Sequence, residues 1–254
     1  MTNSAPGTTE PQSQHPAGRL RGRRIVITGG ASGIGRRTAL LFASEGAAVA
    51  LLDQDADGLA TIAHETQGHA FVADVTDETA VDAAVRQGAE AMGGIDGVVN
   101  AAGVMLRGSV LEVDAATWRR VLDINLTGTY IVVRACLPWL RQAPCATIVN
   151  IASGQGLLPN VPNRTAYAAS KGGVVNLTRA LAAELAPSIR ANSVCPGLVD
   201  TPMAEGVRAN TANYALRRLA DPMEIARAIL FLTSLESSYV TGAALAADGG
   251  RAFH

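Results

Sequence analysis

The sequence predicts a doubly wound α/β fold, in which helices cover both faces of a single seven-stranded parallel sheet. From Arg24 onward, short runs rich in valine and isoleucine alternate with longer segments of helical period, which is typical of βαβ units. The first, second and fifth runs are apolar through most of their length, so both sheet faces are expected to be buried. With 254 residues, 48% of them hydrophobic, the chain is expected to form one domain.

Each predicted strand is a short apolar run that gives way to glycine, aspartate or asparagine. In chain order the runs are Arg24–Thr28, Ala48–Asp53, His69–Asp74, Gly97–Asn100, Ala146–Ala152, Arg190–Cys195 and Ala243–Ala247. The predicted helices carry apolar residues at helical spacing between these runs: Arg36–Glu45, Glu78–Met92, Ala115–Leu140, Ala166–Leu185 and Met223–Thr233. Residues 201–217 show no strong period and are long enough to form a loop over a substrate.

The charge balance argues against two classes of partner. The chain has 21 basic and 22 acidic side chains and a formal net charge of −1, so no long-range field gathers nucleic acid or an anionic membrane surface. No window approaches the length of a membrane span. Residues 1–18 are rich in proline and polar residues without an apolar run, so we expect a disordered tail before a catalytic domain at 19–254.

Cysteine and histidine usage argues against a disulfide framework and a metal site. The three cysteines, Cys136, Cys145 and Cys195, are widely spaced and form no C-x-x-C pair. The four histidines form no H-E-x-x-H motif. A reducing cytoplasm is therefore the expected compartment, and no metal is expected.

A glycine-rich turn follows the first strand and leads into a helix, with Gly29, Ser32, Gly33, Ile34 and Gly35 in it. Glycines at such a turn let the backbone approach a pyrophosphate, which the positive end of the helix then holds. A plain glycine-rich turn without a ligand is the alternative, and the placement of the motif between a strand and a helix argues against it. A nucleoside-triphosphate P-loop is excluded because it needs Lys-Ser or Lys-Thr after the last glycine, where this chain continues with arginine.

Asp53 ends the second strand, about 20 residues beyond the turn, where the ribose hydroxyls of a dinucleotide lie. Its carboxylate accepts from two hydroxyls but repels a 2′-phosphate, and neither Ser32 nor Gln54 supplies a cation, so NAD is expected rather than NADP. A solvated strand-end aspartate is the alternative. Asp74, before Val75, is a candidate for the adenine amino group or for a helix N-cap.

Tyr167 and Lys171 are spaced i and i+4 on one predicted helix, so both side chains project from the same face. A nearby ammonium stabilises phenolate and lowers the phenol pKa, so this pair makes a usable proton carrier. An ordinary surface pair is the alternative, but Lys171 is the only lysine in a chain whose other basic residues are arginines. A compact ammonium fits against ribose hydroxyls where a guanidinium does not.

Ser153 follows the fifth strand, at the sheet edge where ligands bind, and its hydroxyl is a candidate to hold a substrate oxygen. An ordinary turn serine is the alternative. A hydrolase triad is excluded, because no G-x-S-x-G surrounds it and no histidine lies between residues 70 and 253.

From about Arg24 to Gly250, the chain resembles the classical short-chain dehydrogenases/reductases (SDR family). The motifs that carry the resemblance are T-G-x-x-x-G-I-G at 28–35, N-A-A-G at 100–103, Asn125, Ser153, Tyr167-x-x-x-Lys171, P-G-L-V-D-T at 196–201, and Thr241-Gly242 with Asp248-Gly249-Gly250. The resemblance implies a Rossmann fold and a homotetramer paired through 115–140 and 166–185. Ser153 lies fourteen residues before Tyr167, one more than is usual in the family, with prolines in the intervening loop.

The resemblance also implies roles for individual residues. Ser153 would position the substrate oxygen, Tyr167 exchange the proton, Lys171 bind the nicotinamide ribose and lower the tyrosine pKa, and Asn125 hold a water in a proton relay. The residues expected to bind the cofactor are Gly29, Ser32, Gly33, Ile34, Gly35, Asp53, Asp74, Val75, Asn100, Ala101, Gly103, Tyr167, Lys171, Pro196, Gly197, Val199 and Thr201.

The expected activity is NAD-dependent hydride transfer between the nicotinamide and a secondary alcohol or ketone. The alternatives are an NADP-dependent 3-oxoacyl thioester reductase and, from another class, a dinucleotide-binding sensor or scaffold without turnover. Ser153, Gln155 and Tyr167 are expected to contact the substrate. The wider pocket is expected to be mainly apolar and to favour a small neutral alcohol or ketone; its other candidates are Val104, Met105, Leu157, Leu158, Val161 and Met203.

Overall fold

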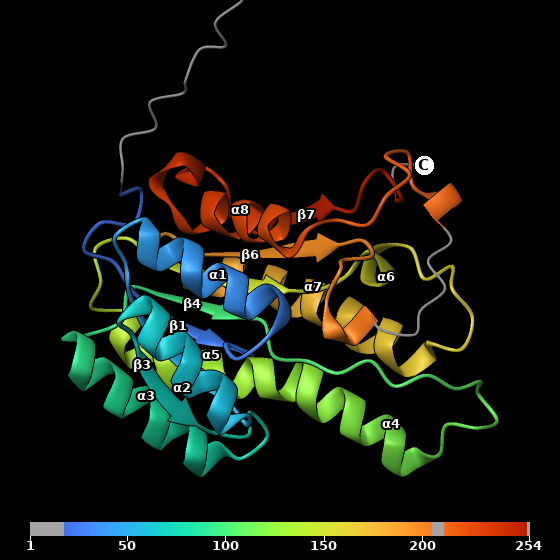
Figure 1. The fold of residues 1–254 in the computed structure, drawn as a ribbon, viewed down its shortest axis with the longest axis horizontal. Coiled ribbons are helices and arrows are strands. Elements are labelled where there is room, and N and C mark those ends of the chain that lie inside the picture. The colour runs from blue at the N-terminus through green and yellow to red at the C-terminus, as the bar shows by residue number, and fades with distance from the viewer. Residues whose placement is uncertain (1–17, 205–210, 253–254) are drawn as a thin grey trace, which may run out of the picture.

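The computed structural model describes residues 18–204 and 211–252 and confirms the predicted doubly wound fold (Figure 1). The described residues contain a parallel sheet with the strand order β3-β2-β1-β4-β5-β6-β7. Its strands are β1 (Arg24–Thr28), β2 (Ala48–Asp53), β3 (His69–Val72), β4 (Gly97–Asn100), β5 (Ala146–Ile151), β6 (Ile189–Pro196) and β7 (Ala244–Ala247). These bounds differ by two residues at most from those expected from the sequence.

The helices cover both faces of the sheet. They are α1 (Gly33–Ser44), α2 (Ala56–Thr66), α3 (Glu78–Met92), α4 (Ala115–Leu122), α5 (Gly128–Leu140), α6 (Gly154–Leu157), α7 (Thr165–Leu185) and α8 (Pro222–Thr233). Short helical turns are η1 (Asp123–Thr127), η2 (Pro202–Ala204), η3 (Thr211–Asn213) and η4 (Leu235–Ser237). Apolar residues of α1, α2 and α8 pack on one face, and those of α3, α5 and α7 pack on the other.

Two neighbouring strand residues show why the apolar runs do not alternate. Val26 of β1 belongs to the core on the α3 side, whereas Ile27 belongs to the core on the α1 side, and both are fully buried. Successive side chains of a strand point to opposite faces, so a strand covered on both faces has to be apolar throughout.

The order of the strands positions the ligand site. β1 lies between β2 and β4, and Thr28 pairs with Leu52 on one side and with Asn100 on the other. Chain connections leave in opposite directions from β1 and β4, which opens a crevice at the carboxyl ends of these strands. The site residues expected from the sequence end or follow a strand at this edge, or lie on a helix or loop beside it.

The helix α2 was not expected from the sequence. Its segment carries only two buried large apolar residues, Leu59 and Ile62, which is too few to reveal a helical period. Asp55 caps it by accepting from the amide of Gly58 at 3.0 Å, and the helix ends at Gln67 in the left-handed conformation. Its partner is the α1 side of the sheet, so tertiary packing rather than local pattern stabilises it.

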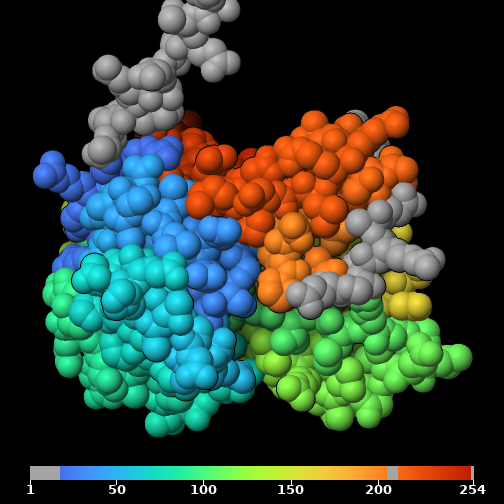
Figure 2. Space-filling view, viewed as in Figure 1, coloured from blue at the N-terminus to red at the C-terminus, as the bar shows by residue number. Residues whose placement is uncertain are grey.

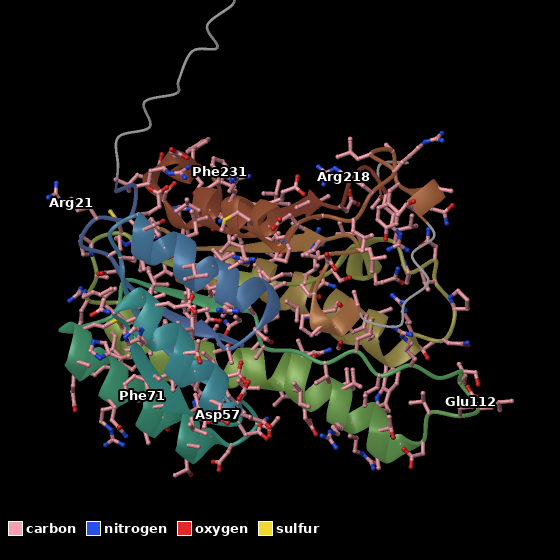
Figure 3. All side chains as sticks on the ribbon, in the orientation of Figure 1. Arg21, Asp57, Phe71, Glu112, Arg218 and Phe231 are labelled. Carbon is pink, nitrogen blue, oxygen red and sulfur yellow. The ribbon has the colours of Figure 1, made fainter. Side chains whose placement is uncertain are left out.

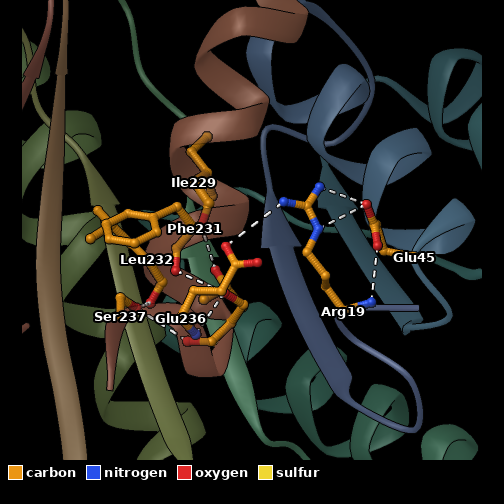
Figure 4. A network of polar contacts seen from close by, with 9 residues as sticks. Arg19, Glu45, Ile229, Phe231, Leu232, Glu236 and Ser237 are labelled. Carbon is orange, nitrogen blue, oxygen red and sulfur yellow. Dashed lines mark hydrogen bonds and ion pairs between the residues drawn. The ribbon is translucent and has the colours of Figure 1, made fainter. Parts of the chain in front are cut away.

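The end of the sheet opposite the site is fastened by the first described residues (Figure 4). Arg19 donates to Glu45 at 2.7 Å through its guanidinium and at 2.9 Å through its backbone amide. The same guanidinium lies 3.9 Å from Glu236, beyond α8. Because these pairs are partly exposed, they serve to align three segments more than to stabilise the fold.

Two expectations fall partly outside the described residues. The tail predicted for residues 1–18 lies outside them except for Gly18, and residues 205–210 of the predicted loop at 201–217 do so too. The described parts of that loop form η2 and η3. Within residues 18–204 and 211–252, no helix has the length and hydropathy needed to span a bilayer.

Labelled charged side chains such as Arg21 and Glu112 lie at opposite ends of the molecule in Figure 3.

Candidate active site

The turn between β1 and α1 approaches the loop after β4 so closely that side chains are excluded. Gly29 has a φ of +66°, and a Cβ there would lie 2.8 Å from the backbone of Ala101 and Ala102. A Cβ at Gly35 would lie 2.0 Å from the carbonyl oxygen of Gly29. Both positions therefore require glycine, and the turn presents bare backbone to the cleft.

Helix α1 begins at this turn with its N-terminus beside the cleft. Its N-cap, Ser32, makes no capping bond through its side chain, and the first turn holds no acidic residue. The positive end of the helix dipole therefore suits the pyrophosphate of a dinucleotide. Gly33 and Ile34 line the cleft, with Thr201 across from them. In Figure 2 the blue segment around α1 faces the orange segment that follows β6 across a seam in the surface.

Asp53 holds a fixed orientation at the end of β2. Its Oδ2 accepts from the amide of Ala31 at 3.0 Å, and its Oδ1 accepts from the amides of Gln54 at 2.7 Å and Asp55 at 3.2 Å. The carboxylate is half-buried and lines the same cleft as the glycine turn. Each oxygen of a carboxylate has two acceptor sites, so these three bonds leave one site, on Oδ2, for a ribose hydroxyl.

Asp74 lies next to this cleft, in an adjoining hollow. Its Oδ1 accepts from the amide and the hydroxyl of Thr76, both at 2.8 Å, and it lines the hollow with Gln54 and Arg120. The N-cap of α3 is Asp77, so the alternative that Asp74 caps this helix is wrong. Val75 lines the cleft itself. Arg120 of α4, which lines both spaces, was not indicated by any sequence motif.

The side chain of Asn100 lies in the core rather than in the cleft. Its Nδ2 donates to Asn150 Oδ1 at 2.9 Å, and Asn150 donates to Thr178 at 2.9 Å, which links β4, β5 and α7. Ala101 and Gly103, which follow Asn100, do line the cleft. A Cβ at Gly103 would lie 3.0 Å from Asn125 Oδ1 and 3.4 Å from Lys171 Nζ. Asn100 thus supports the cleft from beneath through this buried chain of amides.

Asn125 occupies a π-helical turn between α4 and α5, where the sequence predicted one continuous helix over 115–140. Its Oδ1 accepts from the amide of Val104 at 2.8 Å, and its Nδ2 donates to the carbonyl of Val104 and to Ser170 Oγ, both at 3.0 Å. The fully buried side chain clamps the loop after β4 against α7. π-turns inside helices are frequent at functional sites. Here the side-chain amide of Asn125 bonds both Val104 and Ser170.

Ser153, Tyr167 and Lys171 meet at the other end of the crevice. Ser153 caps the short helix α6, and its hydroxyl accepts from the amide of Gln155 at 3.1 Å. A Cβ at Gly156 would lie 2.7 Å from the carbonyl of Lys171, so glycine allows α6 to pack directly on α7. This packing keeps the serine beside the tyrosine and lysine.

Burial changes the proton affinity of the tyrosine and the lysine in opposite directions. Burial raises the pKa of Tyr167, while its hydrogen bond with Ser153 and the charge of Arg164 oppose that rise. Burial lowers the pKa of Lys171 to about 8. The Lys171 ammonium donates to the carbonyl of Ile151 at 2.7 Å, which keeps it at the end of β5.

The cavity around this group is lined by segments from all parts of the chain. The predicted residues that line it are Ile34, Ala101, Gly103, Met105, Ser153, Gln155, Tyr167, Lys171, Pro196, Gly197, Val199, Thr201 and Met203. Val104 lines the cleft at the glycine-turn end instead. Leu157, Leu158 and Val161 are not among the lining residues of either space.

The lining residues missed from the sequence include three with large polar or charged side chains: Arg164, Tyr214 and Arg251. Arg164 lies one helical turn before Tyr167, and that spacing alone was enough to find it. Tyr214 and Arg251 lie far from the motifs in sequence and enter the cavity only through the fold. Within the described residues, no group of three or more His, Cys, Asp or Glu side chains is placed to hold a metal ion.

Comparison with known proteins identifies what the chain is similar to. A family model described as enoyl-(acyl carrier protein) reductase matches residues 29–252. The 3-oxoacyl-[acyl-carrier-protein] reductase FabG of Thermotoga maritima is 39% identical over 243 residues, covering 91% of this chain and 98% of that protein. The 2-(S)-hydroxypropyl-CoM dehydrogenase 3 of Xanthobacter autotrophicus is 40% identical over 250 residues, covering 91% and 97%.

A solved structure extends the similarity to the fold. The ligand-free aldohexose dehydrogenase of Thermoplasma acidophilum matches with a TM-score of 0.85 and 31% identity, covering 92% of this chain and 96% of that one. These proteins agree in reaction class and differ in the substrates that their names carry. The substrate of this chain therefore has to be inferred from its own residues.

Proposed function

This chain belongs to the classical short-chain dehydrogenase/reductase family, and we propose that it transfers a hydride between NAD and a small secondary alcohol or ketone. Like its relatives, it is an oxidoreductase of CH–OH or C=O groups. The observation that carries the proposal is one crevice with the glycine turn and Asp53 at one end and Ser153, Tyr167 and Lys171 at the other. NADH absorbance, followed with panels of secondary alcohols and ketones, tests it.

The proposed roles follow from what each group can donate or accept. Ser153 holds the substrate oxygen by a hydrogen bond, and Tyr167 takes the proton from the alcohol or returns it to the carbonyl. Lys171 binds the ribose hydroxyls beside the nicotinamide and stabilises the phenolate of Tyr167 by its charge. The bound nicotinamide supplies or accepts the hydride. Asn125 positions the loop after β4 and, through its π-turn, is the proposed holder of a water in the proton relay.

The proposed contacts of the cofactor divide the crevice into three parts. The turn residues Gly29, Ser32, Gly33, Ile34 and Gly35 face the pyrophosphate, for which the helix N-terminus supplies the positive potential. Asp53 takes the adenosine ribose, with Asp74 and Val75 toward the adenine. Residues 196–201 face the nicotinamide end.

An NADP-dependent reductase of 3-oxoacyl thioesters is the second candidate. Similarity to the reductase of Thermotoga maritima favours it, and Arg120 places a cation in the cleft that contains Asp53. The carboxylate of Asp53 disfavours a 2′-phosphate more directly, because it stands at the ribose position itself. NAD remains the proposed cofactor.

Asp53→Ala is expected to narrow the preference for NAD over NADP. The unmodified enzyme should use NAD far better, and the change removes a charge-assisted hydrogen bond of about 1.5–3 kcal/mol together with the repulsion of a 2′-phosphate. The ratio of kcat/KM for the two cofactors measures this. Asp57→Ala, which removes an exposed charge on α2, is the control and should leave the ratio unchanged. Equal use of NADP by the unmodified enzyme contradicts the assignment.

We also propose a homotetramer, paired through the helices at 115–140 and 166–185. Tyr130 of α5 and Trp118 of α4, which expose 50% and 36% of their surface in the isolated chain, lie on one of these helical stretches, where the partner would cover them. Light scattering at micromolar concentration should give about four times the chain mass of 26.1 kDa. A monomer mass at that concentration contradicts the proposal.

The cytoplasm remains the proposed compartment. Cys136, Cys145 and Cys195 are free thiols, as a reducing environment leaves them.

The sequence-based expectation of a neutral substrate came from an apolar pocket with one amide, and the arginines described above change the charge of that pocket.

A further inference from the structure

The substrate end of the cavity carries more positive charge than the proposed chemistry uses. Arg164 and Arg251 line it together with Lys171, and the described lining residues include no aspartate or glutamate. Within residues 18–204 and 211–252, neither arginine has a carboxylate within 4.0 Å. A partly desolvated cation without a counter-charge is costly, so such a pair points to an anion that arrives from outside the described chain.

Within residues 18–204 and 211–252, the side-chain partners of Arg251 at this wall are neutral groups. It exposes 7% of its surface, and its terminal nitrogens donate to the side-chain oxygens of Asn160 and Gln155. The ring of Tyr214 lies 5.8 Å from its guanidinium carbon, as in a cation–π contact. These partners fix the direction of the guanidinium, and none of them carries a negative charge. The longer loop before α7 contributes here, because Asn160 belongs to it.

Arg164 stands at a place where a cation is electrostatically unfavourable. It is the N-cap residue of α7, beside the positive end of that helix, and makes no capping bond. Its guanidinium has no hydrogen-bond partner among the described residues. Burial is the largest cause that lowers the pKa of Arg164. The charges of Arg107 and Arg251 lower this pKa further, and Tyr167 and Tyr214 oppose the change. An anion bound between the two arginines removes this repulsion.

We propose that the substrate is a small hydroxy or oxo acid whose oxyanion group, foremost a carboxylate, is held by Arg164 and Arg251 while its carbinol or carbonyl carbon lies at Ser153 and Tyr167. This proposal rests on the proposed function, because it names the substrate class of the same site. It replaces the neutral substrate expected from the sequence. Guanidinium groups match the planar, bidentate geometry of carboxylates, which supports an acid over a neutral alcohol.

The geometry requires a short molecule. A Cβ on Gly154, the residue after Ser153, would lie 3.7 Å from Arg251 Nη1. Arg164 is one helical turn before Tyr167 on α7. Both charges are therefore close to the reacting oxygen, and acids with the hydroxyl on C2, C3 or C4 are the range to test.

Binding without turnover provides the first test. With NADH saturating, butyrate should protect the enzyme in thermal melts at concentrations at least tenfold lower than butyramide, its neutral isostere. Arg164→Met and Arg251→Met should each remove this preference, whereas Arg86→Met, an exposed arginine on α3, should keep it. Arg164→Met tests the idea even if Arg251→Met fails to fold. Propane-1-sulfonate in place of butyrate distinguishes a carboxylate site from a general oxyanion site.

Turnover provides the second test and separates the two proposals. Lactate, 3-hydroxybutyrate and 4-hydroxypentanoate, each as both enantiomers, are compared with their amides and with 2-butanol. We expect a kcat/KM at least tenfold higher for one acid than for its amide, lost in Arg164→Met mainly through KM. Oxidation of amides and 2-butanol as fast as of the acids, with no butyrate preference, overturns the oxyanion site and leaves the proposed function standing. Absence of turnover with every alcohol and ketone overturns the proposed function instead, and the binding test still decides the oxyanion site.

Discussion

Tyr167→Phe is expected to lower turnover by about 10²–10⁴-fold or more, since general acid–base catalysis contributes an effect of this size. The phenyl ring fills the same buried space on α7, so the fold is retained, but no group remains to exchange the proton of the substrate oxygen. NAD binding should persist, because the glycine turn and Asp53 are untouched. Steady-state turnover, NAD affinity and a melting curve on the same samples measure these three outcomes.

Tyr239→Phe is the matched control for this change. Tyr239 is fully exposed, so loss of its hydroxyl should alter neither turnover nor melting temperature. A stable Tyr167→Phe enzyme with a near-normal rate assigns the proton transfer to another group and refutes the proposed role. Loss of NAD binding together with turnover would place Tyr167 in cofactor binding rather than in proton transfer.

Lys171→Arg is expected to lower turnover by two orders of magnitude or more, although it preserves the positive charge. The side chain of Lys171 is buried beside Gly103 and the end of β5, and a Cβ at Gly103 would already lie 3.4 Å from its Nζ. The bulkier, planar guanidinium cannot occupy this space with its charge at the same point, so it misplaces the nicotinamide ribose and tunes Tyr167 poorly. A stable variant with a near-normal rate would show that charge alone suffices.

Lys171→Met is expected to change the pH dependence of stability, because it removes a buried charge. Burial lowers the pKa of Lys171 from 10.5 to about 8, so the ammonium destabilises the folded state below pH 8. This penalty fades as the pH rises from 8 to 10.5, where the lysine is neutral in both the folded and the unfolded chain. Without cofactor, the inactive Lys171→Met protein should therefore melt at a higher temperature than the unmodified protein at pH 7, with a gap that narrows toward pH 10.

The repeating apolar runs were sufficient to predict the strands, because a parallel strand covered on both faces has to be apolar throughout. The order of the strands, with β1 beside β4, came only from the structure. Helix α2 was missed because Leu59 and Ile62 alone do not show a period, and its stability comes from packing. The π-turn at Asn125 was missed because a local change in hydrogen bonding leaves the apolar spacing almost unaltered.

The sequence by itself determined the crevice and its proposed chemistry, because the glycines, Asp53, Ser153, Tyr167 and Lys171 stand at fixed distances from strands whose carboxyl ends must meet. Only the tertiary structure decided the charge of the substrate wall. Arg251 and Tyr214 reach that wall from segments far from Tyr167 in sequence. No local periodicity in the sequence indicates that these segments come together. Side-chain charge at a cavity depends on which distant segments the packed fold brings together, whereas strands and turns depend on neighbours along the chain.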